Sequence, residues 1–280
     1  MTRFEVRPGF SLNVELWGSG PTLVLLHGFT GSAASWGRFG ELLGRSFRCV
    51  AIDIVGHGRS DAPADVADYR MEQVSADLAA AARHAGVAQA PWLGYSMGGR
   101  AALALACLVP GVVSALVTIG ASPGLETENE RAERRRADEE LADRIERHGI
   151  EAFVDYWESL PLWASQQSLP SDVRAAQRRV RLANRPTGLA NSLRGMGAGA
   201  QPSFWEHLPS LDLPFLALAG ELDRKYVEIA RRMVQLAPRG TASAIPGVGH
   251  AAQLEAPGAV VDAVSRFLTD VAEPQLEARP

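Results

Sequence analysis

A serine at the centre of a glycine-flanked pentapeptide is the first candidate for chemistry in this chain. Residues 94–98 (GYSMG) have the G-x-S-x-G pattern, with Ser96 in the middle. An apolar run precedes them and a helical pattern follows, which is the context of a nucleophile elbow, a sharp strand-to-helix turn that exposes the serine hydroxyl. Its glycines leave room for a strained backbone that a Cβ would obstruct. Because the pattern also occurs by chance, its meaning depends on partner residues elsewhere.

A carboxylate that could partner Ser96 is Asp223. The apolar run 214–220 (PFLALAG) has the length and boundaries of a buried strand, and Asp223 lies in the loop directly after it. The alternative role for Asp223 is a helix N-cap, since residues 225–236 have a helical pattern. Because functional side chains of open α/β sheets gather at the carboxyl ends of the strands, the position also suits a catalytic acid.

The remaining partner is His250. Residues 241–245 predict another strand, and the glycine-rich loop 246–250 (PGVGH) presents His250 at the same edge of the sheet. A histidine bonded only to a loop carbonyl is the alternative. The agreement of strand, loop and chain order favours a catalytic triad of Ser96, Asp223 and His250, in which the histidine moves the serine proton and the aspartate orients the imidazole.

Backbone hydrogen-bond donors that could stabilise negative charge developing on a substrate are predicted next to this triad. The sequence His27-Gly28-Phe29 directly follows the apolar run 22–26 (TLVLL). We expect the backbone N–H groups of Phe29 and Met97 to form an oxyanion hole. For His27 itself we favour an orienting role in the loop over proton transfer, since His250 already has that role.

Composition excludes several classes of protein. The chain has 280 residues, 46% hydrophobic and 21% charged, with a net charge of -4, which is typical of a globular protein and argues against nucleic-acid binding. The N-terminal residues do not have the pattern of a signal peptide, and no apolar run has transmembrane length. The histidines lack paired ligand spacing, so no metal or cofactor is predicted. We expect a cytoplasmic monomer or small homo-oligomer without membrane or nucleic-acid partners.

Strand and helix patterns alternate along most of the chain, which predicts an α/β protein with a mostly parallel, doubly wound sheet. The helical pattern 97–108 ends before Pro110, and the first two strands read as an antiparallel pair. The predicted strands are residues 4–7, 12–17, 22–26, 49–54, 92–94, 115–119, 214–220 and 241–245.

One stretch departs from this alternation. Residues 126–207 have helical spacing, many charges and no convincing strand, and they fall between two predicted sheet strands. We therefore expect a helical cap at 126–207 inserted into a core domain formed by 1–125 and 208–270. Residues 271–280 are predicted to form a flexible tail.

These motifs resemble those of the α/β-hydrolase fold superfamily over nearly the whole chain, which implies an eight-stranded, mostly parallel sheet with a helical cap. Within it, the chain is most similar to the menaquinone-pathway lyase family of 2-succinyl-6-hydroxy-2,4-cyclohexadiene-1-carboxylate synthases. The motifs that carry this narrower resemblance are residues 27–32 (HGFTGS) with Trp36, 94–100 (GYSMGGR), Glu130-Arg131-x-x-Arg134, Arg181-x-x-Asn184, 192–195 (SLRG) and 220–225 (GELDRK).

The resemblance implies a reaction and a set of binding residues. The family eliminates pyruvate from 2-succinyl-5-enolpyruvyl-6-hydroxy-3-cyclohexene-1-carboxylate. This substrate has several carboxylates, and guanidinium groups are well suited to bind them. Arg100 lies one helical turn beyond Ser96 on the predicted helix. For the arginines a structural ion pair is the alternative, since Lys225 is the only lysine among the 28 basic residues. The family's motifs place substrate-binding residues at Tyr95, Arg100, Arg134, Trp157 and Arg181.

One residue departs from the family pattern. Glu158 stands beside Trp157 where the family often has a second aromatic side chain, and a carboxylate facing an anionic substrate would repel it. Either Glu158 points away or the substrate differs. The alternative activity is a carboxylesterase that hydrolyses short-chain esters through an acyl-enzyme, and a remote alternative is a non-catalytic small-molecule receptor.

Overall fold

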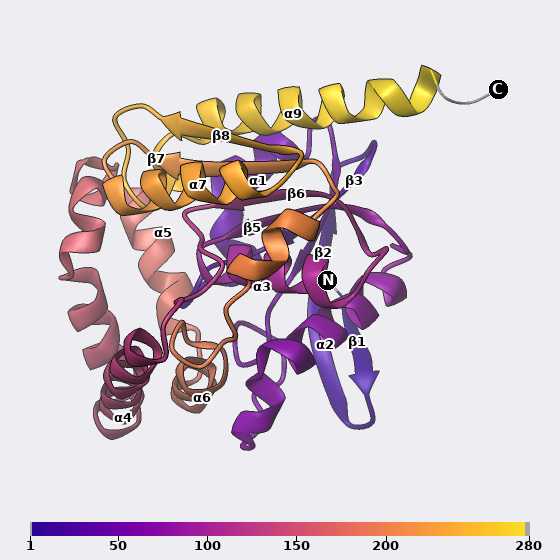
Figure 1. Ribbon diagram of the computed structural model, residues 1–280. Coiled ribbons are helices and arrows are strands. Elements are labelled where there is room, and N and C mark those ends of the chain that lie inside the picture. Colours follow the sequence, from indigo (N-terminus) through magenta and orange to yellow (C-terminus); the bar gives the residue numbers. More distant parts are fainter. Residues whose placement is uncertain (1, 278–280) are drawn as a thin grey trace.

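The computed structural model describes residues 2–277 and the side chains of residues 2–271. Its centre is an eight-stranded sheet in the order β1-β2-β4-β3-β5-β6-β7-β8 (Figure 1). The pairs β1–β2 and β2–β4 are antiparallel and the other pairs are parallel. The predicted mostly parallel α/β sheet is therefore confirmed. The strands are β1 (Thr2–Arg7), β2 (Phe10–Trp17), β3 (Thr22–Leu26), β4 (Arg48–Ile52), β5 (Ala90–Tyr95), β6 (Val113–Ile119), β7 (Phe215–Gly220) and β8 (Gly240–Ile245).

Two layers of helices bury the two faces of the sheet. One apolar cluster joins the sheet to α2, α3 and α7, and a second joins its other face to α1, α8 and α9. The continuous apolar runs of β3 and β4 fit this burial on both sides. These helices are α1 (Gly37–Leu43), α2 (Met71–His84), α3 (Met97–Leu108), α7 (Arg224–Leu236), α8 (Ala252–Glu255) and α9 (Pro257–Glu277), with the 3-10 turns η1 (Ala33–Trp36) and η2 (Val66–Tyr69).

The strands bring the predicted site residues to one edge. Ser96 follows β5, Phe29 lies in the loop after β3, and Asp223 and His250 follow β7 and β8. Strand β4, which follows β3 in the chain, pairs on one side of β3, and β5 pairs on its other side. The strand order therefore reverses between β3 and β5, which is a topological switch point. Ligands of open α/β sheets bind at such a point.

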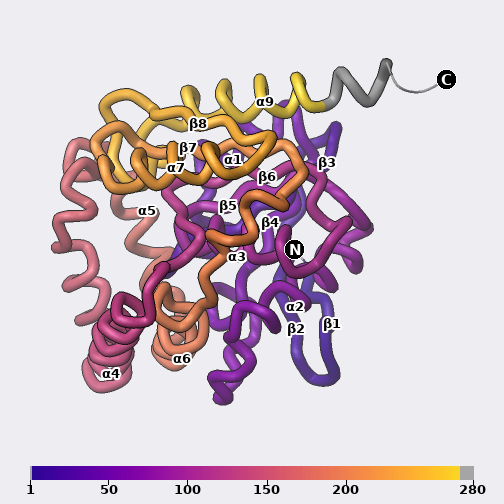
Figure 2. Tube along the Cα trace, in the orientation of Figure 1, coloured from indigo at the N-terminus to yellow at the C-terminus, as the bar shows by residue number. Residues whose placement is uncertain are grey.

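Between β6 and β7 the chain is helical. The segment 126–207 contains α4 (Glu128–Glu158), η3 (Pro161–Ser168), α5 (Ser171–Leu182) and α6 (Pro186–Met196), followed by η4 (Trp205–Ser210). Helix α4 is interrupted at Gly149, whose φ of 78° is not helical. A separate apolar cluster joins α4 to α6, which lie side by side away from the sheet (Figure 2).

The predicted tail at 271–280 differs from the structure over part of its length. Helix α9 continues past Val271 and ends at Glu277, and residues 278–280 lie outside the described residues. No helix within residues 2–277 is both long enough and apolar enough to cross a membrane.

Asn184 ties the helical segment to the sheet domain. It is 5% exposed and follows α5. Its Nδ2 donates to Thr30 O at 2.8 Å, and its Oδ1 accepts from Gly58 N at 2.9 Å. One side chain thus holds the loops after β3 and β4 against the segment 126–207.

Replacing Asn184 by alanine should therefore destabilise the protein. Each lost hydrogen bond leaves a buried backbone group without its partner, so we expect the free energy of unfolding in urea to fall by roughly 2–4 kcal/mol. Asn129→Ala, at an exposed position of α4, is the control and should change it by less than about 0.5 kcal/mol. Equal effects of the two variants would contradict the tethering role of Asn184.

Candidate active site

Ser96 occupies a strained turn between β5 and α3. Its φ of 50° and ψ of -111° lie outside the regions that non-glycine residues favour. The flanking glycines make the turn possible: a Cβ on Gly94 would lie 2.2 Å from Gly98 O, and one on Gly98 would lie 2.2 Å from Leu26 O. The strand-to-helix elbow predicted from residues 94–98 is therefore present.

The structure brings Ser96, His250 and Asp223 into one hydrogen-bonded chain. His250 Nδ1 lies 2.6 Å from Asp223 Oδ2, and His250 Nε2 lies 3.0 Å from Ser96 Oγ. A carboxylate only accepts hydrogen bonds, so Nδ1 carries the proton and Nε2 is free to accept from the serine hydroxyl. Asp223 precedes α7 but makes no side-chain capping bond, because its carboxylate contacts the imidazole instead.

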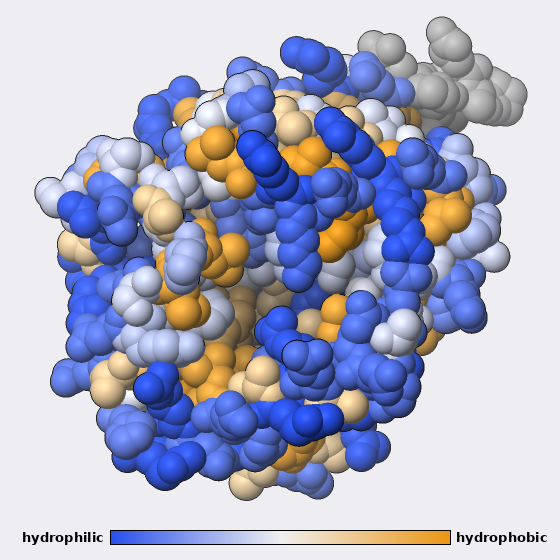
Figure 3. Space-filling model, turned by 60° about the vertical axis from the view of Figure 1, so that its left-hand side comes forward, coloured by the Kyte–Doolittle hydropathy of each residue, from blue (hydrophilic) through white to orange (hydrophobic). Residues whose placement is uncertain are grey.

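A cavity of about 160 Å³ opens onto the serine hydroxyl. Its lining combines residues from the strand ends with residues from the segment 126–207. The space-filling view shows a hollow on this side of the molecule, with apolar residues in its depth and many hydrophilic ones around it (Figure 3). Besides Ser96 and His250, the lining includes the predicted residues Phe29, Tyr95, Met97, Arg100, Arg134 and Trp157.

Two backbone amides are placed to stabilise negative charge in this cavity. Phe29 follows β3 and Met97 is the first residue of α3, directly after Ser96. Neither amide donates a hydrogen bond to another group of residues 2–277. The positive end of the α3 dipole also points toward this position. Both amides are thus available to an anionic oxygen, as an oxyanion hole requires.

Arg100 and Arg134 bring positive charge to the cavity. Arg100 Nη1 donates to Met196 O at 2.8 Å and also to Gln201 Oε1. Burial lowers the pKa of the Arg100 guanidinium to about 10, so it stays protonated at neutral pH. Arg134 is half-exposed and its Nε bonds Asp138 Oδ1 at 2.8 Å. Arg100 lines the cavity one helical turn beyond Ser96, and its role in substrate binding stays a prediction.

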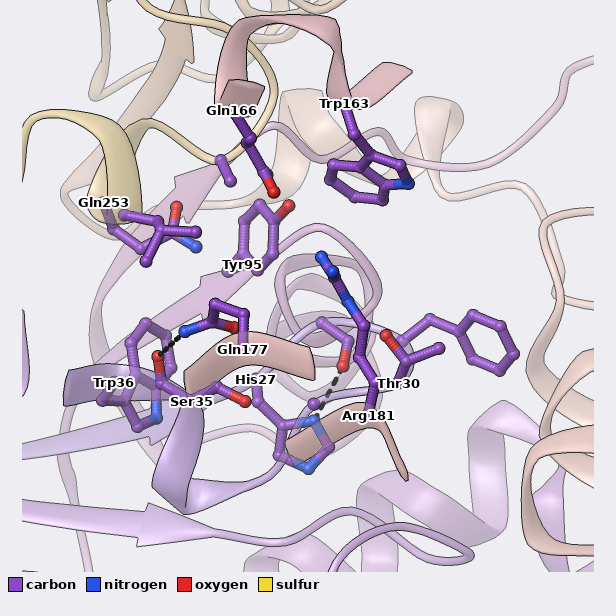
Figure 4. Close-up of a pocket in the computed structure, with 15 residues that line it drawn as sticks. His27, Thr30, Ser35, Trp36, Tyr95, Trp163, Gln166, Gln177, Arg181 and Gln253 are labelled. Atoms are coloured by element: carbon purple, nitrogen blue, oxygen red, sulfur yellow. Dashed lines mark hydrogen bonds between the residues drawn. The ribbon is translucent and has the colours of Figure 1, made fainter. Parts of the chain in front are cut away.

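Arg181 lies outside the cavity that contains Ser96. It lines a smaller cavity of about 40 Å³ beside it, together with Tyr95 and Trp163 (Figure 4). Its Nη1 bonds Glu158 Oε1 at 2.7 Å, and the guanidinium lies 5.5 Å from the centre of the Trp163 ring. Trp163 also lies 5.8 Å from the His250 ring, so one indole neighbours both Arg181 and the triad histidine.

Glu158 points away from the Ser96 cavity. Its two carboxylate oxygens bind Arg178 at 2.8 Å and Arg181 at 2.7 Å. It is absent from the residues that line the Ser96 cavity. The departure from the family pattern at this position therefore places no negative charge against a ligand of Ser96.

Several lining residues were not predicted from the sequence. Tyr226 packs its ring 4.8 Å from the His250 ring, and burial raises the pKa of its phenol. Its position three residues after Asp223, in the first turn of α7, is a signal that could have found it. Ser192 and Leu193 belong to the motif 192–195, which was not assigned to the site. The remaining lining residues carry no comparable motif: Ser122, Leu141, Leu162, Trp163, Gly197 and Ala198.

His27 is engaged in its own loop. Its Nδ1 donates to Gly28 O at 2.8 Å, and its Nε2 accepts from Ile54 N at 3.0 Å. Burial lowers the pKa of His27 to about 4 and that of the adjacent His57 to about 3. Both nitrogens of His27 are occupied and its ring is neutral, which fits an orienting role better than proton transfer.

Comparisons with known proteins agree with this fold. Residues 21–257 match the family model described as alpha/beta hydrolase fold. A protein of Bacillus subtilis (strain 168), provisionally named 2-succinyl-6-hydroxy-2,4-cyclohexadiene-1-carboxylate synthase, is 43% identical over 89% of this chain and 90% of its own. The structure of MenH from S. aureus has a TM-score of 0.88 at 31% identity, covering 93% of this chain and 98% of that one. A thermophilic esterase from Thermogutta terrifontis, solved with malate bound, has a TM-score of 0.85 at 28% identity over 97% and 99% of the two chains.

The matched residues, the strand order and the elbow define an enzyme of the α/β-hydrolase fold. Within that fold, the chain belongs to the family of 2-succinyl-6-hydroxy-2,4-cyclohexadiene-1-carboxylate synthases. The resemblance inferred from the motifs is thereby confirmed.

The two buried histidines generate a pH prediction. Their pKa values in the folded protein lie below the unfolded value of 6.5, so the unfolded chain binds more protons as the pH falls. Their contribution to the free energy of unfolding is fully present above about pH 6.5 and decreases as the pH falls toward 4. Urea denaturation across this range should show the decrease.

Variants can assign that decrease to the buried rings. His57→Phe removes one of them and should make the pH dependence shallower, whereas His148→Gln, at an exposed position of α4, should leave it unchanged. A flat profile between pH 6.5 and 4 in the unmodified protein would show that these histidines are not held neutral by folding.

Proposed function

We propose that this enzyme eliminates pyruvate from 2-succinyl-5-enolpyruvyl-6-hydroxy-3-cyclohexene-1-carboxylate, a step of menaquinone biosynthesis. The observation that carries the proposal is the position of Arg100: a protonated guanidinium that pairs with no carboxylate of residues 2–271 lines the same cavity as the Ser96 hydroxyl. Such a group suits a substrate carboxylate beside the reacting atoms. The names of the related proteins from B. subtilis and S. aureus support the same assignment.

In the proposed mechanism Ser96 acts as a base. His250 accepts the Ser96 proton while Asp223 holds the imidazole in the required tautomer. The serine oxygen removes a ring C–H proton, and the enolate oxygen that forms binds the amides of Phe29 and Met97. The electron pair then breaks the C–O bond to the enolpyruvyl group. This group takes up the proton held by His250 and becomes pyruvate.

The segment 126–207 is proposed to act as a cap on a core formed by residues 1–125 and 208–270. It supplies Arg134 and Trp157 to the cavity lining and thereby limits the access of water to the enolate. Arg181 is proposed as a substrate-binding residue of the smaller cavity, beyond Trp163. The predicted cytoplasmic location and the monomeric or small homo-oligomeric state stay predictions.

A carboxylesterase is the second candidate. The observation in its favour is the similarity to the esterase from T. terrifontis, which has the same fold at a TM-score of 0.85. In that reaction Ser96 would attack an acyl carbon, the same two amides would bind the tetrahedral oxyanion, and water would hydrolyse the acyl-enzyme. The two reactions differ in whether Ser96 bonds to carbon or removes a proton.

Pyruvate release tests the proposal directly. The purified enzyme, incubated with the cyclohexene substrate, should release pyruvate, measured by coupling to lactate dehydrogenase, and should hydrolyse p-nitrophenyl butyrate slowly or not at all. Fast ester hydrolysis without pyruvate release would establish the carboxylesterase instead.

Arg100→Ala should raise KM for pyruvate release at least about tenfold, since a charge-assisted hydrogen bond to a carboxylate is lost. Arg232→Ala is the matched control: Arg232 pairs with Glu126 and is not among the residues of the cavity, so KM should stay within about twofold of the unmodified enzyme. Equal effects of both variants would mean that Arg100 does not bind substrate.

A further inference from the structure

The charge of Arg100 is held by neutral groups. Its Nη1 donates to the carbonyl of Met196 at 2.8 Å and to the side-chain carbonyl of Gln201. Within residues 2–271, no carboxylate lies at ion-pair distance from this guanidinium. Buried arginines are usually paired with acids, because an unpaired charge loses its solvation without compensation. The surroundings of Arg100 therefore orient its charge without cancelling it.

Among the described residues, the charged side chains that line the cavity are the two arginines Arg100 and Arg134, and no carboxylate lines it. Arg134 and Asp138 are charged groups that lie near enough for their fields to act on Arg100. Asp138 is 3% exposed and bonds Arg134 through Oδ1 at 2.8 Å. One carboxylate therefore lies near two guanidinium groups. It is bonded to Arg134 and not to Arg100. A ligand carboxylate would complete the balance.

Gln201 is fixed behind Arg100 by close packing. It is 1% exposed and is not among the residues that line the cavity. Its backbone N donates to Gly197 O at 3.0 Å, and a Cβ on Gly124 would lie 2.7 Å from its Nε2. The loop after β6 and the turn after α6 therefore hold the amide in one place. A glutamate has the same size and would present a carboxylate to Arg100 at that place.

We propose that Gln201 is a positioning residue that aims Arg100 at the cavity while leaving the guanidinium charge available to a substrate carboxylate. The inference deepens the proposed function and rests on it for the identity of the substrate. Residue 201 then determines whether the cavity prefers carboxylate or neutral ligands. An acidic side chain at this position would form an ion pair with Arg100 and repel an anionic ligand.

The test compares two substitutions of glutamine by glutamate. Gln201→Glu places a carboxylate beside Arg100, and Gln235→Glu makes the same change in net charge at an exposed position of α7. The probe is 2-succinylbenzoate, an aromatic dicarboxylate shaped like the proposed product, and its dimethyl ester is the neutral ligand. Dissociation constants are measured by isothermal titration calorimetry.

For Gln201→Glu we expect the dissociation constant of the dicarboxylate to rise at least about tenfold and that of the dimethyl ester to change by less than about twofold. For Gln235→Glu both should stay within about twofold of the unmodified protein. Should Gln201→Glu fail to fold, Gln201→Met removes the acceptor and keeps the charge of Arg100. It should raise KM for the cyclohexene substrate more than it lowers kcat.

Three results would overturn the inference. They are failure of the unmodified protein to bind the dicarboxylate, equal binding of the dicarboxylate by the two glutamate variants, and equal weakening of both ligands by Gln201→Glu. The last would mean that Gln201 only supports the fold. Absence of pyruvate release from the unmodified enzyme would instead contradict the proposed reaction, and the comparison of dissociation constants would still stand.

Discussion

The strained backbone at Ser96 is the constraint on which the site depends. A residue held in such a conformation costs of order 1–3 kcal/mol and persists only where its surroundings fix it. Here the amide of Ser96 donates to Ile119 O at 2.8 Å, and the backbone of Gly98 packs against the end of β3. The same turn begins α3, so it sets at once where the hydroxyl points, where the Met97 amide lies and where Arg100 emerges one turn later.

The positions of the guanidinium groups distinguish this cavity from the active site of a general esterase. Glu158 pairs with the guanidinium of Arg181 beside the Trp163 ring, whereas the acceptors that Arg100 has among the described residues are neutral. The triad and the two amides could serve either elimination or acyl transfer, because both reactions develop an oxyanion. The two arginines that line the cavity beside Ser96, Arg100 and Arg134, are what favours an anionic substrate.

The sequence predicts best those parts of the site that follow directly from a strand. Ser96, Asp223 and His250 each follow a predicted strand, and parallel strands must bring their carboxyl ends to one edge. Helix α3 was predicted with its observed ends, 97 and 108, because an elbow starts it and Pro110 stops it.

The sequence predicts less about residues that long-range packing positions. Arg181 was expected in the substrate cavity, but the way α5 packs against α4 pairs it with Glu158, and no local pattern encodes that contact. The same packing turns Glu158 away from Ser96. Gln201 and Trp163 carry no motif, and only the folded segment shows that one contacts Arg100 and the other contacts the triad histidine.

The most direct test of the relay among these three side chains is the variant Asp223→Asn. Asparagine keeps the shape of the side chain but cannot hold the imidazole in the tautomer that accepts the Ser96 proton. We predict that kcat for pyruvate release falls by about 10⁴-fold while the melting temperature changes little. A variant that keeps kcat within about tenfold of the unmodified enzyme would contradict the relay.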